Sequence, residues 1–133
     1  MTVALLEAIT THLGTLSSAL AVHDVAPGAY FFSRAPQGTA CPYIVLTVPD
    51  DATNPRFSAD NEKTVVDFAV FDDVASPKRA LAILEVLKTA FADNLLGGVV
   101  YGAQRTGDAL IEDEDDEVVI GFDAHTRIEY MHG

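Results

Sequence analysis

The chain has 133 residues, of which 49% are hydrophobic, and this length suits a single domain with a sizeable buried core. That hydrophobic content excludes an intrinsically disordered chain, and the single cysteine excludes an internal disulfide. Eight basic residues stand against twenty acidic ones, and the net charge of −12 disfavours a protein that grips nucleic-acid phosphates. Because there is no basic leader and no apolar run near the roughly 18 residues of a membrane helix, we expect a cytoplasmic protein without a membrane partner.

The first predicted element is an amphipathic helix over residues 2–21, because apolar residues recur there at spacings of two to four. Gly14 inside this helix costs about 1 kcal/mol relative to alanine, so we expect packing to hold the helix together. A connection over residues 23–28 and a short strand over residues 29–33 follow.

A segment with two prolines then predicts a turn and the start of a strand. Pro36 at the second position and Gly38 at the fourth suit a type I turn that begins at Ala35. Pro42 stands where a ladder N–H can be spared, immediately before a run rich in β-branched and aromatic residues. This run predicts a strand over residues 43–48, which we expect to stop at the following proline.

Residues 49–61 predict a loop of about a dozen residues, which is longer than compact domains usually keep without a role in contacts. A strand over residues 62–72 follows, with apolar side chains on one face and a mixed second face. Ser76 as N-cap and Pro77 at the first helical position then predict a second helix that runs to about Asp93.

The last third of the chain predicts strands over residues 99–105 and 109–111, an acidic hairpin tip, and a final strand over residues 118–130 with the clearest alternation in the chain. The resulting order, α-β-β-β-α-β-β, describes a single α+β domain over residues 1–133. We expect a mostly antiparallel sheet of about four to six strands with two helices packed on one face.

This element order, with the letters Arg-Ala-Pro-Gln-Gly at residues 34–38 and Pro-Tyr-Ile-Val at residues 42–45, resembles the tail-completion or tail-terminator family of long-tailed bacteriophages and related prophages. Cys41 departs from the likeness, because a bulkier apolar residue is expected there in the family. The resemblance implies a structural virion protein with no catalytic residue and no cofactor. It implies a ring, usually of six subunits, that caps the tail tube, stops its polymerisation and joins it to the head connector, while DNA passes through the lumen. We therefore expect a location in the neck of the virion, with assembly in the host cytoplasm.

The residues themselves offer no constellation for catalysis. Cys41 as a nucleophile would need a neighbouring histidine as base, and a small buried hydrophobic role is the better interpretation. The four histidines lack the spacing of metal ligands, so we predict no metal site and expect these side chains at the surface or its rim: His12, His23, His125 and His132.

The acidic run near the C-terminus leaves three interpretations open: a solvated hairpin tip, an electrostatic role and a cation site. A calcium loop spaces its ligands and includes a glycine, which six consecutive acids lack. If the resemblance holds, an acidic lumen would repel DNA phosphates and ease the passage of DNA, although the acids would also keep a ring component soluble. The candidate lumen residues are Glu112, Asp113, Glu114, Asp115, Asp116 and Glu117.

Closure of a ring requires one patch of each subunit to meet a different patch on the next subunit. The mixed faces of the strands over residues 63–71 and 118–130 are candidates, and packing within the chain is an equal alternative for them. The alternatives to a terminator are another neck component, such as a head-completion or stopper protein, and a small-ligand-binding or enzymatic domain. The candidate contacts with another subunit or with the tail tube protein are Arg34, Gln37, Arg56, Phe57, Phe71, Val119 and Arg127.

Overall fold

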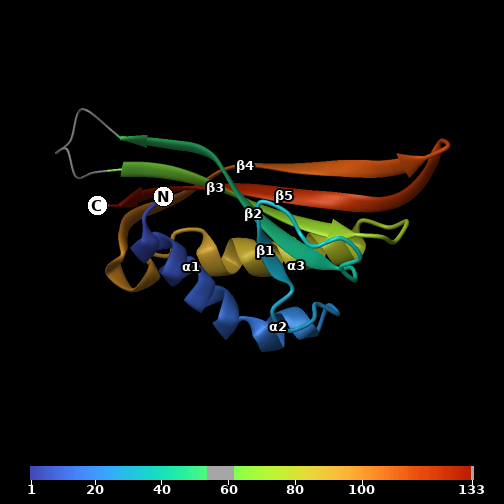
Figure 1. Cartoon of the computed structure of the whole chain (residues 1–133), viewed down its shortest axis with the longest axis horizontal. Helices are drawn as coiled ribbons and strands as arrows, with labels where there is room; N and C mark the ends of the chain where they lie inside the picture. The colour runs from blue at the N-terminus through green and yellow to red at the C-terminus, as the bar shows by residue number, and fades with distance from the viewer. Residues whose placement is uncertain (54–61, 133) are drawn as a thin grey trace.

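The chain folds into one five-stranded sheet with its helices on a single face (Figure 1). In a computed structural model, the backbone is described for residues 1–53 and 62–132, and the side chains for the same residues except 50–53. The sheet order is β1-β2-β3-β5-β4; the β1–β2 pair is parallel and the other three pairs are antiparallel. The predicted α+β class and element order are confirmed. The elements are α1 (Val3–Thr15), α2 (Ser17–Ala21), β1 (Tyr30–Phe32), β2 (Tyr43–Thr53), β3 (Glu62–Asp72), α3 (Lys78–Phe91), the 3₁₀ turn η1 (Leu96–Gly98), β4 (Val100–Asp115) and β5 (Val118–His132).

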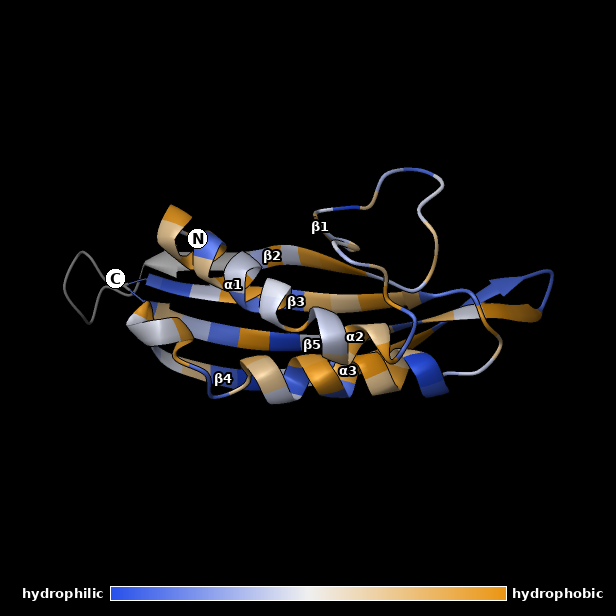
Figure 2. Cartoon of the chain, turned by 90° about the horizontal axis from the view of Figure 1, so that it is seen from below, coloured by the Kyte–Doolittle hydropathy of each residue, from blue (hydrophilic) through white to orange (hydrophobic). Residues whose placement is uncertain are grey.

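The core lies between the sheet and the helix layer, which faces the viewer in Figure 2. Val66, Phe68 and Val70 of β3 are fully buried, and the residues that pair with them in β5 are buried as well. Their spacing of two residues places them on one face of the sheet, as the sequence predicts. Each of the two longer helices contributes one buried apolar stripe: Leu5, Ile9 and Leu13 from α1, and Ile83, Leu87 and Phe91 from α3.

The first predicted helix is interrupted, so the prediction of one continuous helix is wrong. Leu16, with φ −92° and ψ 4°, separates α1 from α2. The hydroxyls of Thr15 and Ser17 on either side donate to backbone carbonyls one turn earlier. Such side-chain bonds compete with helix continuation. Val3, which the pattern placed on the apolar stripe, is 70% exposed.

The turn before β2 begins one residue later than predicted. The Thr39 N–H donates to the Pro36 carbonyl at 3.2 Å, and Gly38 has a φ of 83° at the third turn position. A positive φ there defines a type II turn, which explains the glycine better than a type I turn. β2 also continues past Pro49 to Thr53. The pairing of β2 with β3 changes register between Thr47 and Asp50, so Pro49, which has no N–H, does not have to donate a hydrogen bond to β3.

β3 has the bounds that the sequence predicts, and α3 ends at Phe91, two residues earlier than predicted. Pro77 already has helical backbone angles, and the Ser76 Oγ accepts a hydrogen bond from the Lys78 N–H at 3.3 Å. The Ser-Pro signal therefore marks the start of the helix, but the N-cap is Pro77 and not Ser76, one residue later than predicted. Of the predicted loop over residues 49–61, residues 54–61 lie outside the described part of the chain.

The C-terminal strands form one long hairpin in place of several short strands. β4 is continuous over residues 100–115, so most of the acidic run belongs to a strand, and the prediction that the whole run is the hairpin tip is wrong. Only Asp116 and Glu117 make the turn, with φ values of 51° and 66°. Two consecutive positive φ values are those of a type I′ turn, which matches the twist of a two-residue hairpin. We call residues 110–120 at the far end of this hairpin the arm; it extends past the rest of the sheet in Figure 1.

A buried ion pair fixes the end of β3 beside the base of the arm. The Asp72 side chain is fully buried and accepts hydrogen bonds from the Arg79 Nε at 2.9 Å and the Arg79 Nη2 at 2.6 Å. Arg79 also reaches Asp24, in the connection after α2, at 3.3 Å. β5 passes so close to this point that a Cβ on Gly121 would lie 2.2 Å from the Asp72 carbonyl oxygen. The base of the arm is therefore held by backbone contact and by the ion pairs of Arg79.

Candidate interaction surfaces

The face of the sheet away from the helices, which we call the helix-free face, carries a row of aromatic side chains. Tyr43 stacks on Phe71 with ring centroids 5.3 Å apart, and Phe31 meets the Tyr43 ring edge-on at 6.2 Å. His125 meets the Phe71 ring at 6.1 Å. Phe71, a predicted contact residue, is half-buried among these rings, so the chain itself covers much of it. Aromatic rows of this kind are typical of protein interfaces.

Next to this row, a polar cluster lines a cavity of about 330 Å³. The His125 Nδ1 donates to the Asp67 Oδ2 at 3.0 Å, and the Arg127 Nε lies 3.8 Å from the Asp67 Oδ1. The Arg127 side chain, another predicted contact residue, is 58% exposed. The cavity lining contains no serine, cysteine or lysine that this histidine could activate. The cluster is therefore equipped to bind a polar group and lacks a nucleophile.

The environment of Cys41 disfavours a reactive thiolate. Burial is the main cause of the raised pKa of this thiol, and the nearby carboxylates of Asp73 and Asp72 raise the pKa further. The surrounding cavity of about 390 Å³ is lined by acids and aromatic residues, with no histidine to serve as base.

In the part of the chain that the structure describes, no group of three or more histidine, cysteine or acidic residues is arranged to hold a metal ion.

The acidic run lies on the arm, and one of its members is drawn into a pair. Asp113 and Asp123 of the neighbouring strand line the same cavity of about 390 Å³. Burial, followed by this neighbour, raises the pKa of Asp123 to about 7. The other five acids of the run are exposed, which agrees with a solvated position for most of it. Because the pairing spans β4 and β5, the run alone could not reveal it.

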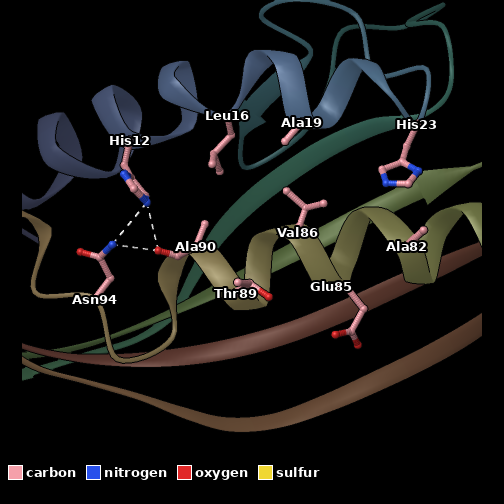
Figure 3. A pocket seen from close by; sticks show the side chains of 10 residues that line it. All are labelled: His12, Leu16, Ala19, His23, Ala82, Glu85, Val86, Thr89, Ala90 and Asn94. Atoms are coloured by element: carbon pink, nitrogen blue, oxygen red, sulfur yellow. Dashed lines mark hydrogen bonds between the residues drawn. The ribbon is translucent and has the colours of Figure 1, made fainter.

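A groove separates α1 and α2 from α3, and its lining is shown in Figure 3. The cavity has a volume of about 690 Å³ and an apolar floor that includes Leu16 and Val86. At one end the His12 Nε2 and the Asn94 Nδ2 both donate to the Ala90 carbonyl at 3.0 Å. The sequence analysis missed this groove, because its two walls are about 70 residues apart in the chain and each one looks like an ordinary amphipathic helix.

A second cavity, of about 380 Å³, continues the groove toward the start of α3. Both cavities are lined by His23 and Ala82, so they form one continuous surface, which we call the helix seam. This end of the seam adds Val22, Val74, Lys78 and Arg79.

The predicted contact residues do not form one surface. Arg34 and Gln37 are exposed in the connection between β1 and β2, Val119 is half-buried on the arm, and Arg56 and Phe57 lie outside the described residues. Phe71 of β3 and Arg127 of β5 share the helix-free face, where His125 of β5 lies between them.

The prediction of four surface or rim histidines is wrong for His132. This residue is fully buried and shares a 2.8 Å hydrogen bond with the equally buried Thr64. The neighbouring strand supplies the partner that a buried imidazole needs. The other three histidines are partly exposed, as expected.

Comparison with known protein families and with characterised proteins finds no match to this sequence. The fold, however, matches a chain from the solved structure of the virion of a native gene transfer agent particle. The two chains share 16% sequence identity with a TM-score of 0.63, and the match covers 92% of this chain and 91% of the other. This likeness establishes a shared fold along nearly the whole chain.

Among the described residues, no helix is long and apolar enough to cross a membrane.

Proposed function

We propose that this protein is a structural component of a phage-like virion and acts as its tail terminator. In this role it caps the tail tube, stops tube polymerisation and joins the tube to the head connector, as a ring of six subunits. It carries out no catalysis and needs no cofactor. The observation that carries the proposal is the fold match to a chain of a gene transfer agent virion over 92% of the sequence. The resemblance of residues 34–38 and 42–45 to the tail-terminator family supports the narrower role.

The surfaces of the chain support binding to other proteins. The sheet ends on one side in β4, a strand of 16 residues. Its outer edge pairs with no other strand among the described residues, so another chain can pair with its backbone groups. The helix-free face offers aromatic rings and the exposed Arg127, and the arm offers exposed apolar side chains. The expected partners are further copies of this chain, the tail tube protein and the head–tail connector.

The test is electron microscopy of lysates from the parent phage or prophage after deletion of the gene. Overlong tails without heads are the expected result, because loss of the cap lets the tube keep growing. Tails of normal length beside unattached, filled heads would overturn the terminator role and favour another neck component. Unchanged virions would overturn the assembly role as a whole.

The lumen role of the acidic run stays a prediction with its own test. Replacing Glu112–Glu117 by the corresponding amides removes six negative charges. Slower DNA ejection from otherwise normal virions would support an acidic lumen. Unchanged ejection and infectivity would contradict it.

A further inference from the structure

The cavity around Cys41, at the base of the arm, combines carboxylates with aromatic rings. It has a volume of about 390 Å³, and the stacked rings of Tyr43 and Phe71 belong to its lining. No lysine or arginine lines it. Half of its ten lining residues are acids: Asp72, Asp73, Asp113, Glu114 and Asp123.

Three of these acids have no cation to balance them. The Nη2 of Arg79 lies 2.6 Å and 3.9 Å from carboxylate oxygens of the two acids where β3 ends, so those two acids are taken. In the described part of the chain, no ion pair reaches Asp113, Glu114 or Asp123. The part of the cavity that β4 and β5 line therefore keeps an excess of negative charge.

One oxygen in this part of the cavity also lacks a hydrogen-bond donor. The Asp123 Oδ1 is buried, and no donor in the described part of the chain reaches it. Asp123 pairs with Ile111 and Gly121 pairs with Asp113, so the two carboxylates are diagonal neighbours on one face of the hairpin. Neither can donate to the other while both are ionised. Because a buried polar atom is normally hydrogen bonded, the missing group is a donor that carries positive charge.

The titration of the lining groups agrees with uncompensated negative charge. Burial, followed by Asp113, raises the pKa of Asp123 to about 7. Burial is also the main cause of the raised pKa of Cys41 and of Tyr43, and neighbouring carboxylates raise both further. A cation in the cavity would favour the ionised form of each group.

We propose that this cavity binds the guanidinium group of an arginine side chain from another protein of the virion. A guanidinium carries five N–H donors, keeps its charge at every physiological pH, and packs against aromatic rings as well as carboxylates. Asp113 and Asp123 accept its hydrogen bonds, and Tyr43 and Phe71 pack against it. The inference rests on the proposed function for the source of this arginine, because the tube and connector proteins are the chains that a terminator meets.

The basic residues of a second copy are poor candidates for this site. Two copies with a net charge of −12 each repel one another, whereas a basic surface of a different protein is attracted. Five of the eight lysines and arginines of the chain already lie within 4.0 Å of a carboxylate: Lys63, Arg79, Lys88, Arg105 and Arg127.

The first test is an NMR titration of the full chain with Nα-acetyl-arginine N-methylamide as the probe. We expect saturable shifts of the backbone amide signals of the cavity residues, with a dissociation constant on the order of millimolar for a single side chain. The citrulline derivative is the matched neutral probe, because it has nearly the same shape without the charge. We expect it to cause no saturable shifts. Equal binding of both probes, or arginine-induced shifts spread over the whole acidic surface, would overturn the site.

The second test compares two variants that lose one charge each. We expect Asp123→Asn to weaken binding of the arginine probe by about fivefold or more, since this residue supplies the oxygen without a donor. Asp115→Asn is the matched control, because Asp115 is exposed on the arm outside the cavity lining, and we expect it to bind the probe like the wild type. Amide spectra of both variants show whether they remain folded. If both variants weaken binding equally, the probe senses only the overall charge, and the site is wrong.

The third test examines the source of the arginine in the parent phage. We expect Asp123→Asn to lower the yield of complete virions and Asp115→Asn to leave it unchanged. A normal yield from Asp123→Asn would overturn the assignment to a virion partner.

The site and the proposed function fail separately. Overlong, headless tails after gene deletion, together with no saturable binding of the arginine probe, would overturn the site and leave the terminator role in place. Saturable binding at the cavity with unchanged virions after deletion would refute the terminator role and with it the virion source of the arginine.

Discussion

Replacement of Gly121 by alanine tests whether close packing at the base of the arm holds the hairpin to the body of the domain. An added Cβ would lie 2.2 Å from the Asp72 carbonyl oxygen and 3.2 Å from the Asp73 Cα, whereas ordinary contact begins at about 3.4 Å. Both neighbours are backbone atoms, so β5 must move by about 1 Å away from the end of β3. That movement would also disturb the buried pair of Asp72 with Arg79. We expect the free energy of unfolding to fall by about 2–4 kcal/mol.

The assay is urea denaturation followed by circular dichroism, since the chain contains no tryptophan. Gly107→Ala is the matched control, because a Cβ on this strand glycine meets nothing within 4 Å and its φ is not in the left-handed region. We expect this control to change the free energy of unfolding by less than about 1 kcal/mol, with stabilisation as the favoured sign. If Gly121→Ala is as stable as Gly107→Ala, the close approach does not hold the arm, and the reasoning is refuted.

Three further predictions concern ionisable groups. Arg79→Ala leaves the buried Asp72 carboxylate without its partner, so we expect a loss of about 2–4 kcal/mol in the free energy of unfolding. Asp24→Asn removes the charge of one exposed partner of Arg79 and keeps a residue type that tolerates the φ of 68° at this position, so it should cost less than about 1 kcal/mol. Equal losses in denaturation of the two variants would contradict this assignment. The pKa of Asp123 is raised from 3.8 to about 7, so the folded state holds this proton more tightly than the unfolded state, and stability should fall as the pH rises from about 4 to 7. Because Asp123 and Asp113 are partly exposed, water screens their interaction, and we expect Asp123→Asn to reduce the pH-dependent change in the free energy of unfolding by about 1–2 kcal/mol. Denaturation curves of this variant with the pH profile of the wild type would refute the pairing. Because the pKa of the Cys41 thiol is raised, iodoacetamide should modify this thiol more slowly at pH 8 than it modifies free cysteine. The rate is measured by mass spectrometry, and equal rates would contradict the argument that burial raises this pKa.

The parts of the fold that the sequence predicts well are those where one local signal acts alone. β3 buries every second side chain on its helix side, β5 alternates buried and less buried side chains over most of its length, and α3 follows an apolar stripe that begins at a Ser-Pro start signal. In these segments the propensity of the backbone and the burial of one face favour the same structure. The predictions are accordingly accurate to within a few residues there.

The misassigned segments are those where tertiary pairing overrides a local signal. Pro49 predicts the end of a strand, yet β2 passes it because the register shift with β3 removes the need for its hydrogen bond. The acidic run predicts a hairpin tip, yet its residues 112–115 pair with β5 across one register shift, and only Asp116 and Glu117 turn. Neither pairing can be read from one segment, because each depends on its neighbour in the sheet.

The candidate surfaces are harder to predict than the fold, since each one joins distant parts of the chain. The pair of Asp113 with Asp123, the cluster of Asp67 with His125, and the helix seam all arise across two elements. Only the exposed apolar residues of the arm lie near each other in the sequence, and there the acids between them favour the interpretation of a solvated tip.

The strongly acidic composition finally sets how assembly should depend on salt. Subunits that each carry a net charge of −12 repel one another when they approach, and this repulsion acts over about 10 Å or less once salt reaches about 0.1 M. Because these excess charges repel one another and salt screens the repulsion, we expect light scattering to show stronger self-association at 0.5 M than at 0.05 M sodium chloride. Wild-type association that weakens with salt would mean that attraction between charged patches dominates, and the acids would then be part of the binding energy instead of an obstacle to it.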